Sequence, residues 1–80
     1  MPNPSRNRQD PILLSLGGAI KRIRLSKNIS QEKLALLAEV DRSYMGRVER
    51  GDNNVAILTL ARIACALDIS VSELIQEANF

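Results

Sequence analysis

The sequence predicts an all-α domain of five helices, and three observations support this prediction. Apolar residues recur at helical spacing in five segments, capping or polar residues separate these segments, and no segment alternates like a β-strand. The chain has 80 residues, of which 45% are hydrophobic and 25% are charged, a composition typical of one globular domain. We expect residues 1–10, with two prolines and little to bury, to form a flexible arm, and residues 11–80 to form the domain.

The first two helices are predicted at residues 11–27 and 31–38. Asp10 precedes the first helix and Ser30 precedes the second, and both are favoured N-cap residues. The residues expected on the buried faces are Ile12, Leu13, Leu16, Ile20 and Ile23 in the first helix, and Leu34, Leu37 and Ala38 in the second. Gly17 and Gly18 lower the helix propensity of the first segment.

A third short helix is predicted at residues 42–50, close behind the second. Asp41 is its expected cap, Met45 and Val48 are expected to face the core, and Gly51 is expected to end the helix. Two short helices joined by a turn of three or four residues form a helix-turn-helix. We therefore predict this motif between Gln31 and Arg50.

Two further helices complete the predicted fold. Residues 57–67 are apolar almost all round, which predicts a helix covered on more than one side. Ser70 and Glu73 form a capping box that opens a fifth helix. The apolar residues expected on one stripe of this helix are Val71, Leu74, Ile75 and Ala78.

The only cysteine and the apolar segments bear on where the protein works. Cys65 has no partner for an intrachain disulfide and is expected to behave as a small hydrophobe, which fits the reducing cytoplasm. The apolar run at residues 12–20 is interrupted by Gly17 and Gly18 and is too short to span a bilayer. We expect no membrane association.

The charges are distributed unevenly along the chain. The net charge is +2, but residues 1–51 hold ten of the eleven Lys and Arg against five acids, while residues 52–80 hold one base against four acids. A basic front half is typical of a protein that binds a polyanion such as nucleic acid.

The expected outer face of the helix at residues 42–50 is polar and basic. Its members are Arg42, Ser43, Gly46, Arg47 and Arg50. A B-DNA major groove admits one helix, from which an arginine can make bidentate hydrogen bonds to guanine. Arg42 is our candidate for that contact, with Ser43 beside it and Gly46 allowing close approach to the groove wall.

Residues around this helix are candidates for contacts with the DNA backbone. Gln31 lies at a helix N-terminus, where it can anchor a phosphate or steady a neighbouring base-reading side chain. Arg50, Asn53 and Asn54 follow the third helix and are expected along the backbone on its far side.

Catalysis and cofactor chemistry have no support in the sequence. The chain has no histidine, no carboxylate pair in an acid-base pattern and no cluster of metal ligands. We predict no enzyme activity, no cofactor and no metal site. Since five helices use the whole chain, we also expect no small-molecule ligand.

Several linked motifs resemble the phage-repressor-like helix-turn-helix family, called the Xre or Cro/C1 type. The resemblance covers about residues 16–74 and rests on the order and spacing of five segments. These are Ile23-Arg24, residues 31–35 (QEKLA), residues 40–51 (VDRSYMGRVERG), residues 60–67 (LARIACAL) and residues 71–74 (VSEL). The family implies a five-helix lambda-repressor-like fold, and the sequence at residues 41–44 looks most like the controller proteins of restriction-modification systems, which are homodimeric transcription regulators.

The resemblance also implies roles for individual residues. Arg24 and Glu49 match an ion pair between the first and third helices, and Ala35 matches a small residue where the second and third helices cross. The positions that match DNA contacts are Gln31, Arg42, Ser43, Tyr44 and Arg47 in the helices and Asn53 and Asn54 in the following loop. Two roles are expected for Tyr44: its hydroxyl group contacts a phosphate, or its ring belongs to the edge of the core.

Four positions depart from the family pattern. Glu39 stands where the family usually has Gly or Asn in a left-handed conformation, so we expect mild backbone strain or a slightly different turn there. Val55-Ala56 replaces a proline and a capping Ser or Thr, which predicts a poorly capped fourth helix. Gly46 replaces a common serine.

The sequence suggests two ways of using the fold. One is a homodimer that places two recognition helices on a pseudo-palindromic operator, through an interface formed by Ile57, Leu58, Val71, Leu74, Ile75 and Ala78. RNA polymerase is a further candidate partner, through Glu32, Glu39 and Asp41. The alternative is an antitoxin or another protein-interaction module, since one fold hosts both functions.

Overall fold

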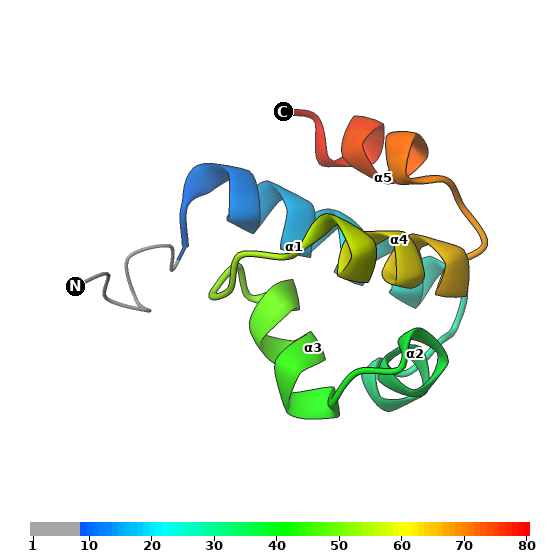
Figure 1. Ribbon diagram of the computed structural model, residues 1–80. Helices are drawn as coiled ribbons and strands as arrows, with labels where there is room; N and C mark the ends of the chain where they lie inside the picture. The colour runs from blue at the N-terminus through cyan, green and yellow to red at the C-terminus, as the bar shows by residue number, and fades with distance from the viewer. Residues whose placement is uncertain (1–8) are drawn as a thin grey trace.

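The structure, a computed structural model, describes residues 9–80, which form five α-helices (Figure 1). The helices are α1 (Pro11–Ser26), α2 (Gln31–Ala38), α3 (Arg42–Glu49), α4 (Ile57–Ala66) and α5 (Val71–Ala78). No strand occurs in this part of the chain, so the all-α prediction is confirmed. All five helices begin at the predicted residue, and the first four end within one residue of the predicted end. Most of the predicted arm, residues 1–8, lies outside the described residues.

The helices pack around α4, which crosses the middle of the view in Figure 1 with α5 above it and α2 and α3 below it. α4 contacts α2 and α5, while α1 contacts α3 and α5. α2 and α3 also pack against each other, joined by the short connection that the sequence predicted.

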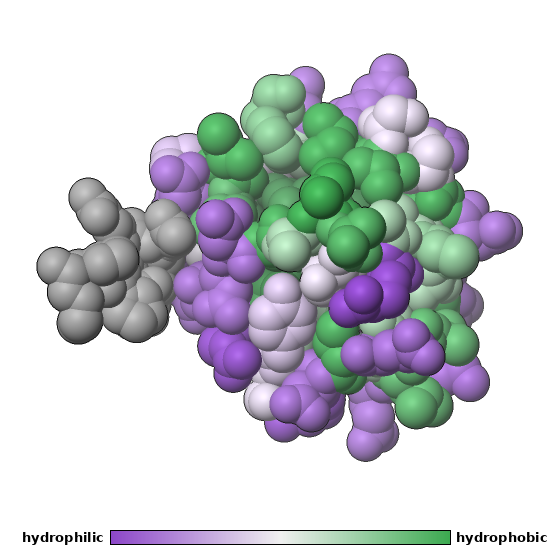
Figure 2. Space-filling model, viewed as in Figure 1, coloured by the Kyte–Doolittle hydropathy of each residue, from purple (hydrophilic) through white to green (hydrophobic). Residues whose placement is uncertain are grey.

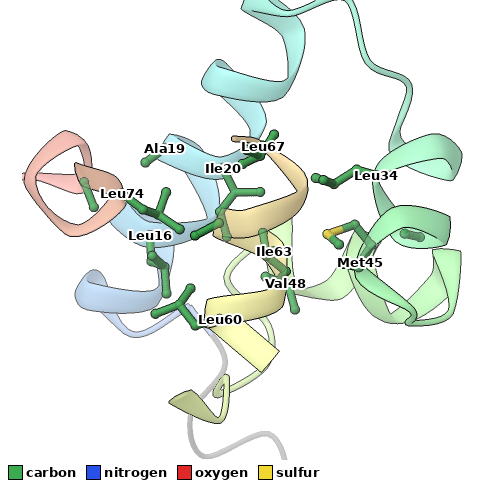
Figure 3. Packing of buried hydrophobic residues seen from close by; sticks show 14 residues of the cluster. Leu16, Ala19, Ile20, Leu34, Met45, Val48, Leu60, Ile63, Leu67 and Leu74 are labelled. Carbon is green, nitrogen blue, oxygen red and sulfur yellow. The ribbon is translucent and has the colours of Figure 1, made fainter. Parts of the chain in front are cut away.

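Every helix contributes at least one fully buried side chain to a single core (Figure 3). The largest of these are Ile20, Leu34, Met45, Val48, Ile63, Leu67 and Leu74. Burial of each such side chain contributes about 1.5–3 kcal/mol. Met45 and Val48 are 0% and 2% exposed, which confirms their predicted orientation.

Side-chain caps define where three of the helices begin. The side chains of Asp10 and Ser30 accept hydrogen bonds from the backbone N–H groups of Ile12 (2.9 Å) and Lys33 (3.0 Å). Ser70 and Glu73 form the predicted capping box. In that box the backbone N–H of Ser70 donates to the Glu73 carboxylate and lowers the pKa of Glu73.

The other two helices lack such caps. Asp41 occupies the N-cap position of α3, but its side chain makes no capping hydrogen bond, so that part of the prediction is wrong. Ala56 precedes α4 and offers no capping side chain, as predicted. Glu39, which ends α2, has the expected left-handed backbone with φ of 61°.

The structure corrects several burial predictions. Ile12 and Leu37 are exposed, and Ala35 takes the buried place that Leu37 was expected to fill. α4 packs against both α2 and α5, in agreement with a helix covered on more than one side, while Ile57, Leu58 and Cys65 are exposed. Leu74 and Ala78, predicted for a dimer interface, face the core of the monomer instead.

Gly17 lowers the helix propensity of α1 but allows a close contact with α3. A Cβ atom at this position would collide with the backbone carbonyl oxygens of Val48 and Glu49. α1 therefore lies close against the C-terminal end of α3 only because residue 17 has no side chain. No helix in residues 9–80 is both long and apolar enough to cross a membrane.

Substituting Gly17→Ala should destabilise the fold, because the new methyl group meets backbone atoms that cannot move independently of α3. We expect a loss of about 1–3 kcal/mol in the free energy of unfolding, measured by urea denaturation. Gly18→Ala is the matched control: its Cβ would meet only the end of the Arg22 side chain at 3.4 Å. This control should gain about 0.5–1 kcal/mol from helix propensity. Equal effects at both positions would contradict the close packing.

Candidate nucleic-acid interface

The exposed face of α3 gathers three of the candidate DNA-binding residues, Arg42, Ser43 and Arg47, and Arg50 follows directly as an exposed C-cap residue. Met45 and Val48 on the opposite face of α3 fill the core. A helix of eight residues cannot hold such an orientation alone, so its packing sets which face meets solvent.

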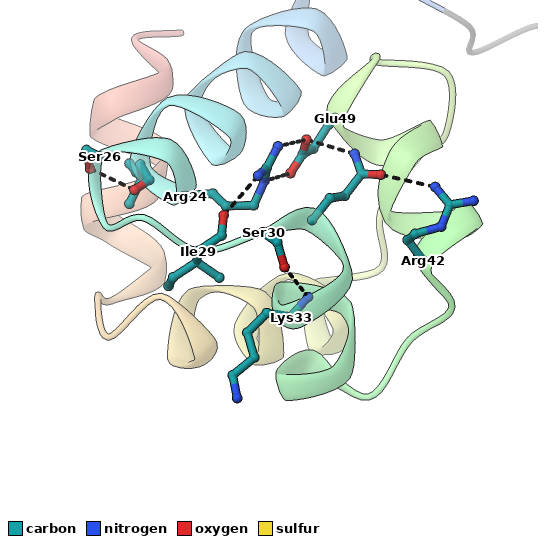
Figure 4. Close-up of polar contacts among 9 residues, drawn as sticks. Arg24, Ser26, Ile29, Ser30, Lys33, Arg42 and Glu49 are labelled. Carbon is teal, nitrogen blue, oxygen red and sulfur yellow. Dashed lines mark hydrogen bonds and ion pairs between the residues drawn. The ribbon is translucent and has the colours of Figure 1, made fainter.

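A buried ion pair fixes the end of α3 to α1. Arg24 donates from Nε to Oε2 of Glu49 at 2.7 Å and from Nη2 to Oε1 at 3.0 Å. The Arg24 Nη1 atom also donates to the backbone carbonyl of Ile29 at 2.9 Å, in the connection before α2 (Figure 4). Both charged side chains are nearly inaccessible to solvent. The predicted pair therefore exists, and it joins α1, α3 and the entry to α2.

Gln31 connects this pair to the surface. Its Nε2 atom donates to Oε1 of Glu49 at 3.0 Å, and its Oε1 atom accepts a longer hydrogen bond of 3.4 Å from Nη1 of Arg42 (Figure 4). The amide thus bridges a buried carboxylate and an exposed arginine. This arrangement matches the second role predicted for Gln31, that of steadying a neighbouring side chain.

Gly46 has a different surrounding from the one predicted. It is buried rather than open to solvent, and a Cβ atom there would lie 3.2 Å from Nη1 of Arg50 and 3.5 Å from Oε1 of Gln31. Its lack of a side chain therefore leaves room for the end of the Arg50 side chain, whereas the distance to Gln31 is that of an ordinary van der Waals contact. Ala35 is buried on α2, which fits its expected role between α2 and α3.

Tyr44 and Arg47 form a stacked pair on α3. The guanidinium carbon of Arg47 lies 5.8 Å from the centroid of the Tyr44 ring, a distance within the range of a cation–π interaction. The Tyr44 ring is half-buried and packs against the core. This packing matches the second role expected for Tyr44, at the edge of the core.

Residues after α3 form a loop with its own polar contacts. Arg50 donates from Nε to Oδ2 of Asp52 at 3.1 Å, a pairing that the sequence analysis did not anticipate. The Asn54 side chain accepts a hydrogen bond from the backbone N–H of Val55, and Asn53 is half-buried. The i, i+2 spacing of Arg50 and Asp52 was the available signal, but such proximity alone does not predict an ion pair.

The site is built for charge and hydrogen bonding. Within residues 9–80, no group of three or more His, Cys, Asp or Glu side chains is arranged to hold a metal ion. The exposed groups are guanidinium, hydroxyl and amide groups on one short helix and its flanks, which suit the edges of bases and the phosphates of a duplex.

Comparison with known proteins agrees with this geometry. The helix-turn-helix family matches residues 20–74. The control protein C.BamHI of Bacillus amyloliquefaciens is 40% identical over 65 residues, covering 80% of each chain. The control protein C.MunI of Mycoplasma sp is 34% identical over 67 residues, covering 82% of this chain and 90% of that protein.

A solved structure extends the likeness to three dimensions. The crystal structure of the restriction-modification controller protein C.AhdI from Aeromonas hydrophila superposes with a TM-score of 0.76 at 45% identity, covering 78% of this chain and 94% of that one. The fold and the exposed face of α3 define a DNA-binding regulator of helix-turn-helix type. The chain belongs to the helix-turn-helix family of the Xre or Cro/C1 type, and the predicted resemblance to controller proteins is confirmed.

Glu49→Leu should cost about 3–5 kcal/mol of unfolding free energy, because it leaves the buried Arg24 guanidinium without its counter-charge. The double variant Arg24→Met, Glu49→Leu should lose much less than the sum of the single losses, since no unpaired charge remains. Urea denaturation of Glu49→Leu, of Arg24→Met and of the double variant measures this coupling.

Arg22→Met is the control for loss of an arginine on α1. Its ion pair with Glu77 is long, at 4.0 Å, and its hydrogen bond to the backbone carbonyl of Glu77, at 3.1 Å, is exposed to solvent. The expected cost is therefore below about 1 kcal/mol. Additive losses for Arg24 and Glu49 would show that their pairing does not stabilise the fold.

Proposed function

We propose that the chain binds double-stranded DNA as a homodimer and regulates transcription, as the controller protein of a restriction-modification system. The observation that carries this proposal is the exposed basic face of α3, which the burial of Met45 and Val48 turns toward solvent. The proposal assigns the chain no reaction, cofactor or small-molecule ligand, and it places the protein in the cytoplasm with the DNA.

In this proposal α3 enters the major groove. Arg42 makes bidentate hydrogen bonds to a guanine, and Ser43 makes an adaptable contact beside it. Arg47 and the hydroxyl group of Tyr44 contact phosphates. The residues that follow the backbone are Arg50, Asn53 and Asn54, while Gln31 takes the other of its two expected roles and steadies Arg42. The exposure of Arg42, Ser43 and Arg47 supports these roles.

Dimerisation is proposed through one side of α4 and α5. Ile57 and Leu58 are large apolar residues that the monomer leaves exposed, and Val71 and Ile75 are half-buried. A hollow of about 750 Å³ on α5 is lined by Val71, Ser72, Ile75, Gln76, Asn79 and Phe80. Figure 2 shows hydrophobic side chains gathered over the region of α4 and α5. Phe80 is also exposed and is a member of this surface that the sequence analysis missed.

The symmetry of such a dimer determines the form of its DNA site. Two copies of α3 related by a two-fold axis require a pseudo-palindromic operator, with half-site centres about 10–10.5 base pairs apart or a multiple of that distance. The domain is residues 11–80, and residues 1–10 are proposed as an arm outside it. Contact with RNA polymerase is proposed through the exposed acids Glu32, Glu39 and Asp41.

A second candidate function is an antitoxin or other protein-interaction module. It is favoured by Leu36 and Leu37 on α2, which are exposed apolar residues away from the proposed dimer surface. Leu37 borders a hollow of about 440 Å³, shared with Glu39, Arg62, Cys65 and Ala66. Ionic strength separates the two functions, because each neutralised phosphate adds about −0.9 to the slope of log affinity against log salt. An apolar protein interface lacks that dependence.

Selection of tight binders from random duplexes tests the main proposal. The selected sequences should contain a dyad, and Arg42→Ala should weaken binding to them by about 1–3 kcal/mol while weakening binding to random duplex much less. Binding isotherms at fixed salt measure both losses. Selected sequences without a dyad would contradict the symmetric dimer. Equal losses of affinity on both duplexes would show that Arg42 contacts only phosphate and does not read a base.

Leu58→Glu should disrupt the dimer, since it removes about 1.5–3 kcal/mol of apolar burial and places a charge in the interface. That loss raises the dimer dissociation constant by roughly tenfold or more in sedimentation experiments. Leu36→Glu is the matched control, because Leu36 is 70% exposed and Leu58 is 73% exposed. It should leave dimerisation unchanged. If Leu36→Glu disrupted the dimer and Leu58→Glu did not, the interface would lie on α2 and the proposed one would be wrong.

A further inference from the structure

The carboxylate of Glu49 accepts more hydrogen bonds than its ion pair requires. Arg24 occupies both oxygen atoms, and Oε1 accepts a further hydrogen bond from Nε2 of Gln31 at 3.0 Å. An ionised carboxylate has acceptors only. Gln31 must therefore turn the NH2 end of its amide toward Glu49.

This requirement fixes what Gln31 presents on its other side. An amide carries one oxygen end and one NH2 end, so the oxygen faces away from Glu49 and toward α3. There it lies 3.4 Å from Nη1 of Arg42. A carbonyl oxygen at this place attracts a guanidinium group, whereas an NH2 group would repel it. The buried carboxylate thus determines which kind of residue is favoured at position 42.

Gly46 lies beside this arrangement on α3. A Cβ atom at residue 46 would lie 3.5 Å from Oε1 of Gln31, an ordinary van der Waals distance. The bridge therefore does not depend on the absence of a side chain at residue 46.

We infer that Glu49 is a positioning residue for DNA reading: through the Gln31 amide, its buried carboxylate holds Arg42 in place before the duplex arrives. The inference rests on the proposed function and deepens it, because it assigns a role in sequence discrimination to residues that do not themselves touch a base. Glu49 then has two roles: it pairs with Arg24 within the fold, and it positions Arg42 for DNA reading.

The expected benefit is a smaller loss of side-chain freedom on binding. Immobilising one flexible side chain weakens binding by roughly two- to twelvefold, and an arginine that is already held avoids part of that loss. The benefit applies only where Arg42 is ordered by a base. It should therefore appear on the selected duplex and be nearly absent on random DNA.

Gln31→Met is the test, since methionine keeps the length and helix propensity of glutamine at this half-exposed position but makes neither hydrogen bond. We expect affinity for the selected duplex to fall roughly two- to twelvefold and affinity for random duplex to fall less than twofold. In the Arg42→Ala background, the same substitution should cause no further loss. Lys33→Met, also in the first turn of α2, is the control for a change in charge and should weaken both duplexes alike.

The result separates this inference from the proposed function. If Gln31→Met weakens both duplexes equally, or if its effect multiplies with that of Arg42→Ala, Gln31 acts on DNA by itself and the positioning role is wrong. If Arg42→Ala has no effect on the selected duplex, the proposed reading of DNA by α3 is wrong instead.

Glu49→Gln provides a second variant. The new side chain has no charge and one oxygen in place of two, so it attracts the NH2 group of Gln31 less strongly and fixes the orientation of that amide less firmly. Discrimination between the two duplexes should fall, though no further than in Gln31→Met, at a temperature where thermal unfolding shows the variant folded. In a chain that already carries Gln31→Met, Glu49→Gln should not reduce discrimination further; an additional loss would contradict the relay.

Discussion

The pairing of Arg24 with Glu49 is the constraint on which the recognition surface depends. Apolar contacts are not directional, so Met45 and Val48 alone hold α3 against the core without fixing its end. The ion pair is directional, with two hydrogen bonds between the same two side chains. Arg24 also donates a hydrogen bond to the backbone carbonyl of Ile29, so one buried charge pair fixes the positions of α1, α3 and the start of α2 relative to each other. Buried pairs are costly to desolvate, and this one is better understood as specifying an arrangement than as adding stability.

The same end of α3 is held by a close approach that excludes side chains. Gly17 lies against the carbonyl groups of Val48 and Glu49, the last turn of a helix whose own dipole disfavours a carboxylate there. The guanidinium group of Arg24 offsets that unfavourable charge. Gly17 and Arg24, both on α1, therefore act together, one by allowing contact and the other by supplying charge. α3 carries few apolar residues, and this combination lets it remain both short and rigid.

Local signals explain how much of this could be predicted from sequence. Helix starts were predictable because Asp10, Ser30 and Ser70 cap through hydrogen bonds within three residues of themselves. The buried face of α5 was predictable, because Leu74 and Ala78 lie on its expected apolar stripe, although they are buried within the monomer. The buried face of α2 was less predictable, since α2 buries Ala35 rather than Leu37, and packing against a neighbouring helix decides between them. The sequence allows two roles for Gln31, because its bridge depends on side-chain orientation between α2 and α3.

The uneven distribution of charge gives the chain an orientation as well as a site. Ten of the eleven basic residues lie in residues 1–51, while residues 52–80 carry a net negative charge. In the structure, exposed arginines lie on and next to α3 and exposed acids lie on α5. A phosphate backbone attracts the arginines and repels the acids, so the encounter favours approach with α3 leading. Glu73 and Glu77 are exposed on α5, where the dimer surface is proposed. In the proposed dimer, like charges brought together across the two-fold axis would repel, which favours an interface formed by the apolar residues of α4 and α5 over one that includes these acids.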